Sequence, residues 1–186
     1  MITLQYAISK EDYVNFYTYV MWDAPENKKK RFNYYVRQII PIVLFIIAFY
    51  YTGIFERNSK FILLILAFIF LTSLLSLFNV RSNTVRQGEK VANDPNNSSV
   101  FLDIYMIVSE TGISTKDTLM ETKFQWNAFI KKQESKEYYF LFMSSMQALI
   151  IPKRIFNNAD ERIQFEKLLS QWLSFDAEIG HMVKPS

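Results

Sequence analysis

The chain has 186 residues, half of them hydrophobic, and a formal net charge of +3. It contains no cysteine, which excludes disulfides, thiolate metal ligands and cysteine nucleophiles. The positive charge does not indicate nucleic acid as a partner. Much of it lies beside two long apolar segments, where membrane topology accounts for it.

The N-terminal part, residues 1–38, predicts a short strand followed by an amphipathic helix. Residues 2–8 begin with the alternation of apolar and polar side chains that is typical of a strand. Ser9 and Asp12 then resemble a helix capping box with Asp in place of Glu. Apolar side chains follow at helical spacing, namely Tyr13, Phe16, Tyr17, Val20 and Met21. This helix would lie in the headgroup region of a membrane or pack on the C-terminal domain, and both alternatives stay open.

Two apolar segments, residues 39–55 and 61–80, are separated by five residues. The second has the length needed to cross about 30 Å of hydrocarbon, and it carries no charge. The pair predicts a transmembrane hairpin, with Pro41 tolerated at the start of the first helix. We expect no secretory signal, since the first segment follows several basic residues and no small-residue cleavage site follows it.

The distribution of Lys and Arg predicts the orientation of this hairpin. Five basic residues precede the first segment, namely Lys28, Lys29, Lys30, Arg31 and Arg37. Three follow the second segment, and only Arg57 and Lys60 lie between the two. The positive-inside bias therefore places both termini in the cytoplasm, with a multi-pass protein in the plasma membrane. Lys28, Lys29, Lys30 and Arg31 are candidate contacts to lipid headgroups or to a partner.

The C-terminal part predicts a run of antiparallel strands closed by one helix. We expect a long strand with apolar residues from Val100 to Val108 on one face, a turn at 110–112, and a return strand from 113. A further strand is expected over 118–126, whereas 127–132 is ambiguous between a strand and a short helix. A polar turn at 132–137 precedes a second hairpin, which Pro152 ends. A helix capped by Asn158 and Glu161 completes an α+β domain.

These patterns divide the chain into five parts. They are residues 1–38, a hairpin over 39–80, a linker over 81–98, a cytoplasmic domain over 99–176 and a polar tail over 177–186. A strand of seven residues is not stable alone. We therefore expect residues 2–8 to pair with the C-terminal sheet, on the same side of the membrane.

Several short motifs look familiar when read together. They are Gly112-Ile113, Trp126 with Phe129-Ile130, the run from Tyr139 to Phe142, and Ile150-Ile151-Pro152-Lys153-Arg154-Ile155-Phe156. With the N-terminal strand, the Glu11-Asp12 helix and the two apolar segments, they resemble the YcxB-like family of small bacterial membrane proteins. The resemblance implies a PH-like C-terminal domain, a bent antiparallel sheet or partial barrel closed by one helix. It implies no catalytic activity.

The residues themselves predict no enzyme, no metal site and no cofactor. The single histidine, His181, stands in the polar tail, and the four glycines are too scattered for a phosphate-binding loop. Lys153 and Arg154 would bind a lipid headgroup phosphate, or else Lys153 is solvated and Arg154 forms a structural ion pair.

We expect the domain to mediate interaction with a protein or with the lipid surface. The alternative is an accessory subunit of a membrane transport or export complex. The hairpin, with small residues Thr72, Ser73 and Ser76 on its second segment, would then contact a protein partner or a second copy. Membrane lipid is the expected partner in either case, and nucleic acid is not.

Overall fold

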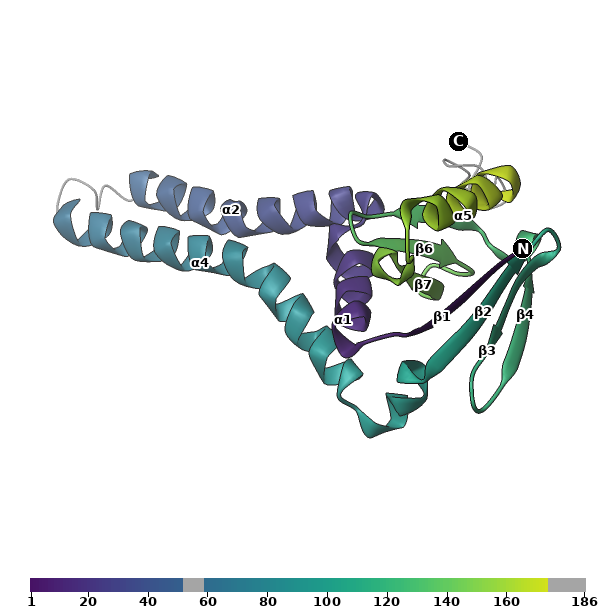
Figure 1. The fold of residues 1–186 in the computed structure, drawn as a ribbon. Helices are drawn as coiled ribbons and strands as arrows, with labels where there is room; N and C mark the ends of the chain where they lie inside the picture. Colours follow the sequence, from purple (N-terminus) through teal and green to yellow (C-terminus); the bar gives the residue numbers. More distant parts are fainter. Residues whose placement is uncertain (52–58, 174–186) are drawn as a thin grey trace. The chain divides into compact units, whose positions relative to one another are not determined.

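The computed structural model describes residues 1–51 and 59–173 (Figure 1). Most of the expected loop between the apolar segments and the whole tail with His181 lie outside these ranges. The chain forms two compact units. One unit comprises Met1–Phe16 with Glu89–Ser186, and the other comprises Tyr17–Gly88.

The first unit contains a four-stranded antiparallel sheet in the order β1-β2-β3-β4. Its strands are β1 (Ile2–Ala7), β2 (Asp103–Ser109), β3 (Gly112–Lys116) and β4 (Glu121–Gln125). Strand β1 pairs with β2 so that Ile2 lies opposite Val108 and Ala7 opposite Asp103. The predicted pairing of the N-terminal strand with the C-terminal sheet is therefore confirmed. The alternating burial of β1 shows why, because every second side chain enters the core.

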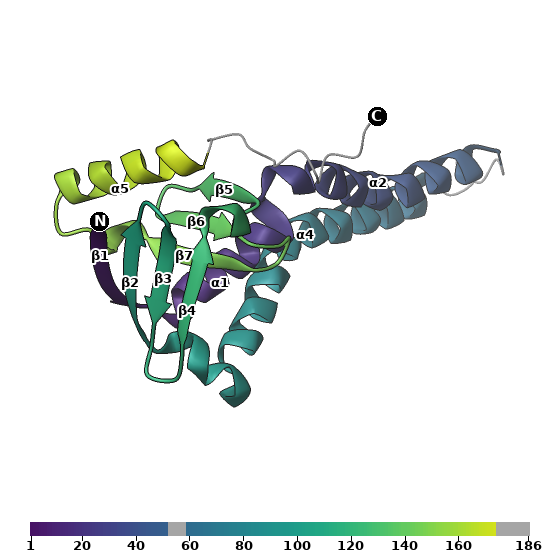
Figure 2. The same ribbon diagram turned by 90° about the vertical axis from the view of Figure 1, so that its right-hand side faces the viewer.

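A second antiparallel sheet faces the first and has the order β5-β6-β7, as Figure 2 shows. Its strands are β5 (Lys131–Glu134), β6 (Tyr138–Phe142) and β7 (Ala148–Pro152). The helix α5 (Ala159–Trp172) begins at Asn158, whose side chain accepts a hydrogen bond from the Glu161 N–H. Its buried Phe165 packs on the ring of Tyr139 at 5.5 Å between centroids. The α+β fold with antiparallel sheets and a C-terminal helix is confirmed.

Three local predictions in this unit are wrong, and side-chain capping explains two of them. Residues expected to begin the first long strand form a 3₁₀ helix, η3 (Pro95–Phe101), because Asp94 accepts a hydrogen bond from the Asn96 N–H and Pro95 follows it. The strand expected over 118–126 starts only at Glu121, because Asp117 holds a turn before it.

The third wrong prediction concerns the polar turn expected at 132–137. Residues Lys131–Glu134 form β5, although their sequence shows no apolar alternation. Strand β6, in which all five residues are buried, supplies the pairing edge and the packing. The ambiguous segment before β5 contains the short 3₁₀ helix η4 (Trp126–Ala128).

The second unit is helical. Helix α1 (Lys10–Thr18), most of which belongs to the first unit, leads into a π-helix, η1 (Tyr19–Asp23), and a 3₁₀ turn, η2 (Pro25–Asn27). Two long helices follow, α2 (Lys28–Tyr51) and α4 (Ser59–Ala92), which run side by side in Figures 1 and 2. Helix α4 extends to Ala92, so much of the expected linker is helical.

The predicted place of Pro41 at the start of a helix is wrong. Helix α2 begins at Lys28, so Pro41 lies in its interior. Its ring nitrogen cannot donate to the carbonyl of Arg37, one turn earlier, and a kink is the usual consequence. The prediction is wrong because hydropathy locates the start of the apolar segment, whereas the helix begins earlier, in polar residues.

By length and composition, one helical stretch of the described residues could cross a membrane. It is Pro25–Ala48, with a mean hydropathy of 1.2 and no residue of its apolar window buried. A single stretch of this kind is weak evidence and does not establish the expected hairpin of two transmembrane helices.

Candidate membrane-interface site

The start of α2 is joined to the π-helix η1 through side chains that bind its last carbonyl groups. Asn27 donates to the Val20 carbonyl at 2.7 Å, and the Lys30 ammonium donates to the Met21 carbonyl at 3.0 Å. The Arg31 guanidinium donates to the carbonyls of Trp22 and Ala24. A helix end carries partial negative charge on such carbonyls, so cations stabilise it. Two of the four predicted contact residues, Lys30 and Arg31, therefore also serve as caps.

Three aromatic rings cluster beside these caps. Trp22 lies edge-on to Tyr34 and Tyr35, at 5.8 and 6.4 Å between ring centroids. The Trp22 side chain is buried, whereas Tyr35 is partly exposed. Trp and Tyr are enriched at the depth of lipid headgroups, where one end of the ring system is apolar and the other is hydrated. No sequence pattern predicted this cluster, although Trp22 and Tyr34 are only twelve positions apart.

An exposed ion pair connects η1 to α4 within the same unit. The Arg81 guanidinium lies 3.1 Å from the Asp23 carboxylate, and both side chains are well exposed. Such a pair contributes little to the free energy of unfolding in water. The pair does, however, mark one end of the second apolar segment, because Arg81 follows that segment directly.

Beyond the caps and rings, α2 presents apolar side chains to the outside. Lys28 and Lys29 are exposed at its first turn. Further along, the exposed large apolar residues are Ile39, Ile40, Val43, Leu44, Ile46 and Ile47. Lys28 and Lys29, together with the rings of Trp22, Tyr34 and Tyr35, lie at one end of this exposed apolar helix. Cations and aromatic rings in this arrangement are typical of a membrane–water boundary.

The predicted contact residue Arg154 lies in the other unit and forms a structural ion pair. Its two terminal nitrogens bind the two carboxylate oxygens of Asp12, in the bidentate arrangement that favours arginine. The Asp12 side chain is 2% exposed and that of Arg154 is 54% exposed. This is the second of the two alternatives that the sequence left open for Arg154.

Further hydrogen bonds complete the surroundings of Asp12. Its carboxylate accepts from the Tyr138 hydroxyl at 2.9 Å and from the Ser9 N–H at 2.8 Å, which confirms the predicted capping box. Burial alone would raise the pKa of Asp12. The hydrogen bonds from Arg154, Ser9 and Tyr138 outweigh burial and hold this pKa below its ordinary value of 3.8. Asp12 is therefore a carboxylate that fixes the first turn of α1 to the domain.

Lys153 is also engaged within the domain. Its ammonium pairs with the Glu134 carboxylate at 2.5 Å and lies over the Tyr139 ring, 4.7 Å from the centroid. Only 18% of the Lys153 side chain is exposed, so the alternative of a solvated lysine is wrong. The partners of Lys153 and Arg154 lie far from them in sequence, and no local pattern indicated them.

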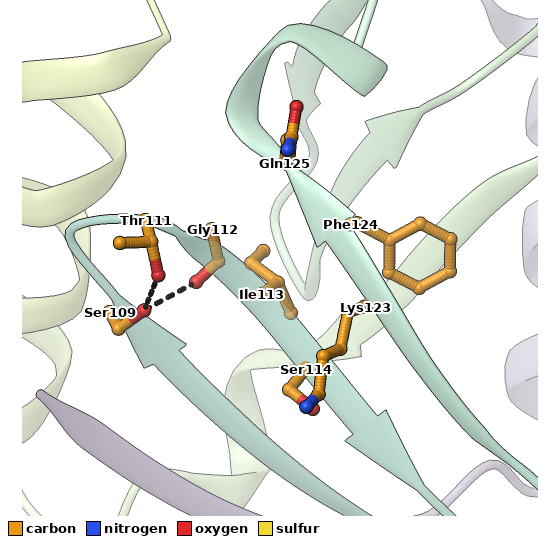
Figure 3. Close-up of a pocket in the computed structure, with 8 residues that line it drawn as sticks. All are labelled: Ser109, Thr111, Gly112, Ile113, Ser114, Lys123, Phe124 and Gln125. Atoms are coloured by element: carbon orange, nitrogen blue, oxygen red, sulfur yellow. Dashed lines mark hydrogen bonds between the residues drawn. The ribbon is translucent and has the colours of Figure 1, made fainter.

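An open pocket of about 370 Å³ lies at the turn between β2 and β3 (Figure 3). Its lining residues are Ser109, Thr111, Gly112, Ile113, Ser114, Lys123, Phe124 and Gln125. The Ser109 hydroxyl donates to the Gly112 carbonyl at 3.1 Å. The Lys123 ammonium lies 3.4 Å from the Glu121 carboxylate. The lining offers hydroxyls and one cation but no acid–base pair, so it shows no reaction centre.

Comparison with known proteins gave one finding for this chain. The model of the family described as YcxB-like protein matches residues 108–169, which run from β2 into α5. No curated protein and no solved structure matched the chain. The resemblance that the sequence motifs indicated is thereby confirmed. Residues 108–169 form a YcxB-like domain.

Proposed function

We propose that this is an integral membrane protein of a bacterial plasma membrane, without enzymatic activity. Helices α2 and α4 cross the bilayer as a hairpin. The YcxB-like domain, on the cytoplasmic side, mediates interaction with a protein or with the lipid surface. The observation that carries this proposal is the exposed apolar surface of α2, where Ile39 is 54% and Leu44 is 60% exposed.

Leaving apolar surface exposed to water is unfavourable, by about 25 cal/mol for each Å². Single exposed apolar residues are normal on a soluble protein, but a contiguous set along one helix marks contact with lipid or protein. A bilayer removes the whole set from water without a complementary protein surface. Lipid is therefore the surrounding that best fits α2.

The same argument extends to α4. Its described apolar side chains include Phe68, Phe70, Leu71 and Leu75, each more than half exposed. The helix has 34 residues, and at about 1.5 Å per residue it is about 50 Å long. A helix of this length crosses about 30 Å of hydrocarbon and still leaves several turns on the cytoplasmic side.

The orientation rests on the placement of the cations. Lys28 and Lys29 are exposed at the start of α2, and Arg86 and Lys90 are exposed near the end of α4. Both of these ends belong to the cytoplasm under the positive-inside rule. Both termini and the YcxB-like domain would then share that side.

Membrane fractionation tests the proposal of two spanning helices. The protein should stay in the membrane pellet at alkaline pH and at high salt. Changing Lys28, Lys29, Lys30 and Arg31 to Gln should leave this result unchanged, since each basic residue near an anionic leaflet contributes only about 1 kcal/mol. Release of this variant by salt would show that the helices do not span.

Cysteine labelling tests the orientation in a chain that has no cysteine of its own. An impermeant thiol reagent applied to intact cells should label Ser59→Cys, at the first residue of α4. It should label Lys136→Cys, in the exposed turn between β5 and β6, only after the membrane is opened. Labelling of Lys136→Cys in intact cells would reverse the orientation and refute a cytoplasmic domain.

A further inference from the structure

The turn that joins β3 to β4 is held in one shape by Asp117. The Asp117 carboxylate accepts hydrogen bonds from the N–H groups of Leu119 and Met120, at 2.6 and 2.8 Å. The Asp117 N–H in turn donates to the Met120 carbonyl at 3.0 Å. This side-chain turn defines the backbone of all four residues, so the side chains at its tip are presented in a fixed direction.

Two large apolar side chains stand at this tip. Leu119 is 70% exposed and Met120 is 63% exposed. Turns are usually built from Gly, Asn, Asp, Ser and Pro, which favour the turn and are compatible with water. Neither Leu nor Met favours a turn, and neither is needed here for the backbone, because Asp117 closes it. The structure therefore gives these two side chains no role inside the domain beyond a weak contact from the Thr122 hydroxyl to the Met120 sulfur at 3.8 Å.

Among the described residues, the charges beside the tip balance. Lys116 and Glu121 lie opposite each other on β3 and β4, Lys123 pairs with Glu121, and Asp117 is used in the turn. Two positive and two negative groups form no patch that would attract a strongly charged partner. Any binding at the tip must come from removing Leu119 and Met120 from water.

From these observations we propose that the Leu119–Met120 tip inserts into the interfacial layer of the lipid bilayer. The proposal rests on the membrane attachment described above. A convex tip with two apolar side chains is too small for a stable protein interface, which buries about 800 Å² on each partner. A bilayer needs no shaped pocket, and it accepts protruding apolar side chains between its headgroups.

The chain connection tethers the domain to α4. Ten residues, 93–102, link the end of α4 to the start of β2. Even fully extended, they span at most about 35 Å. The bilayer is therefore always at a high effective concentration for this domain, and a weak insertion is sufficient to hold it there.

Site-directed fluorescence in proteoliposomes tests the insertion with the full-length protein. A single cysteine at Met120→Cys carries an environment-sensitive dye, and the lipids carry nitroxide quenchers both near the headgroup and along the acyl chain. Matched samples use Lys136→Cys, in another turn of the same domain, and Ile47→Cys, on the exposed face of α2. The backbone groups of Met120 hold the turn, so its side chain can be replaced without loss of the hydrogen bonds.

We expect the quenchers to reduce the emission at Met120→Cys at least about twofold more than at Lys136→Cys, and 0.5 M salt to leave this difference unchanged. Equal quenching at the two turns, with Ile47→Cys quenched, would overturn the insertion and leave the membrane span intact. An Ile47→Cys sample without quenching would instead refute the span. Attachment of a photo-crosslinker at Met120→Cys to a protein in native membranes, and not to lipid, would also overturn the proposal.

Discussion

The ion pair between the buried Asp12 and the half-exposed Arg154 predicts unequal costs for the loss of each partner. Replacing Arg154 by Met keeps most of the side-chain volume but leaves the Asp12 carboxylate, which is 2% exposed, without its cation. Removing one partner of a buried pair costs about 3 kcal/mol or more. Replacing Asp12 by Asn leaves instead a guanidinium that is 54% exposed and can be hydrated. This second change should cost less, about 2 kcal/mol.

The pKa of Asp12 determines how the cost of Arg154→Met changes with pH. In the native protein, the pKa of Asp12 lies below its ordinary value of 3.8. The pair therefore stabilises the fold above the unfolded pKa, and this contribution is lost as the pH falls through the folded pKa. In Arg154→Met, burial is no longer outweighed by the guanidinium, and the pKa of Asp12 should rise. Protonation then removes a buried charge, so the penalty of Arg154→Met should shrink between pH 7 and pH 4.

Denaturant unfolding of the full-length protein in detergent, followed by tryptophan fluorescence at both pH values, measures these differences. The control is Arg162→Met, which removes an exposed ion pair with Glu166 at 3.4 Å on α5. This control should cost less than about 0.5 kcal/mol. The double variant Asp12→Asn with Arg154→Met should cost less than the sum of the two single changes. A penalty for Arg154→Met no larger than that of the control, or one that grows at low pH, would refute the reasoning.

Three further predictions concern the sheets. Deleting residues 1–8 should make the YcxB-like domain more sensitive to protease, because β2 loses its pairing with β1; unchanged resistance would contradict this role. Gly112→Ala should prevent normal folding, since Gly112 has φ +143° and a Cβ would lie 2.0 Å from the Phe124 carbonyl oxygen; a soluble, cooperatively unfolding variant would argue against it. Tyr6→Phe should lower the free energy of unfolding by about 1 kcal/mol, because the Tyr6 hydroxyl donates to the buried Ile150 carbonyl at 3.0 Å.

Local sequence patterns were sufficient for the elements whose stability is local. Alternation in Ile2–Ala7 predicted β1, and the Ser9–Asp12 capping box and the Asn158 cap were recognised from residues three positions apart. The C-terminal motifs that resembled the YcxB-like family lie within the matched residues 108–169, whereas the N-terminal strand, the Glu11-Asp12 helix and the two apolar segments lie outside them. Patterns of this kind record which face of an element is buried and where its first turn begins.

Which side chains contact one another is determined only by the tertiary structure. Arg154 binds a carboxylate 142 positions away. Lys30 and Arg31 bind carbonyls of Met21 and Trp22 in the π-helix, and no spacing rule predicts these contacts. Strand β5 exists although its four residues are polar, because the buried strand β6 pairs with it. Periodicity determines that a side chain is buried, but its partner depends on how distant segments assemble. The sequence therefore determined most of the elements, whereas the ion pairs and caps that connect them followed from packing.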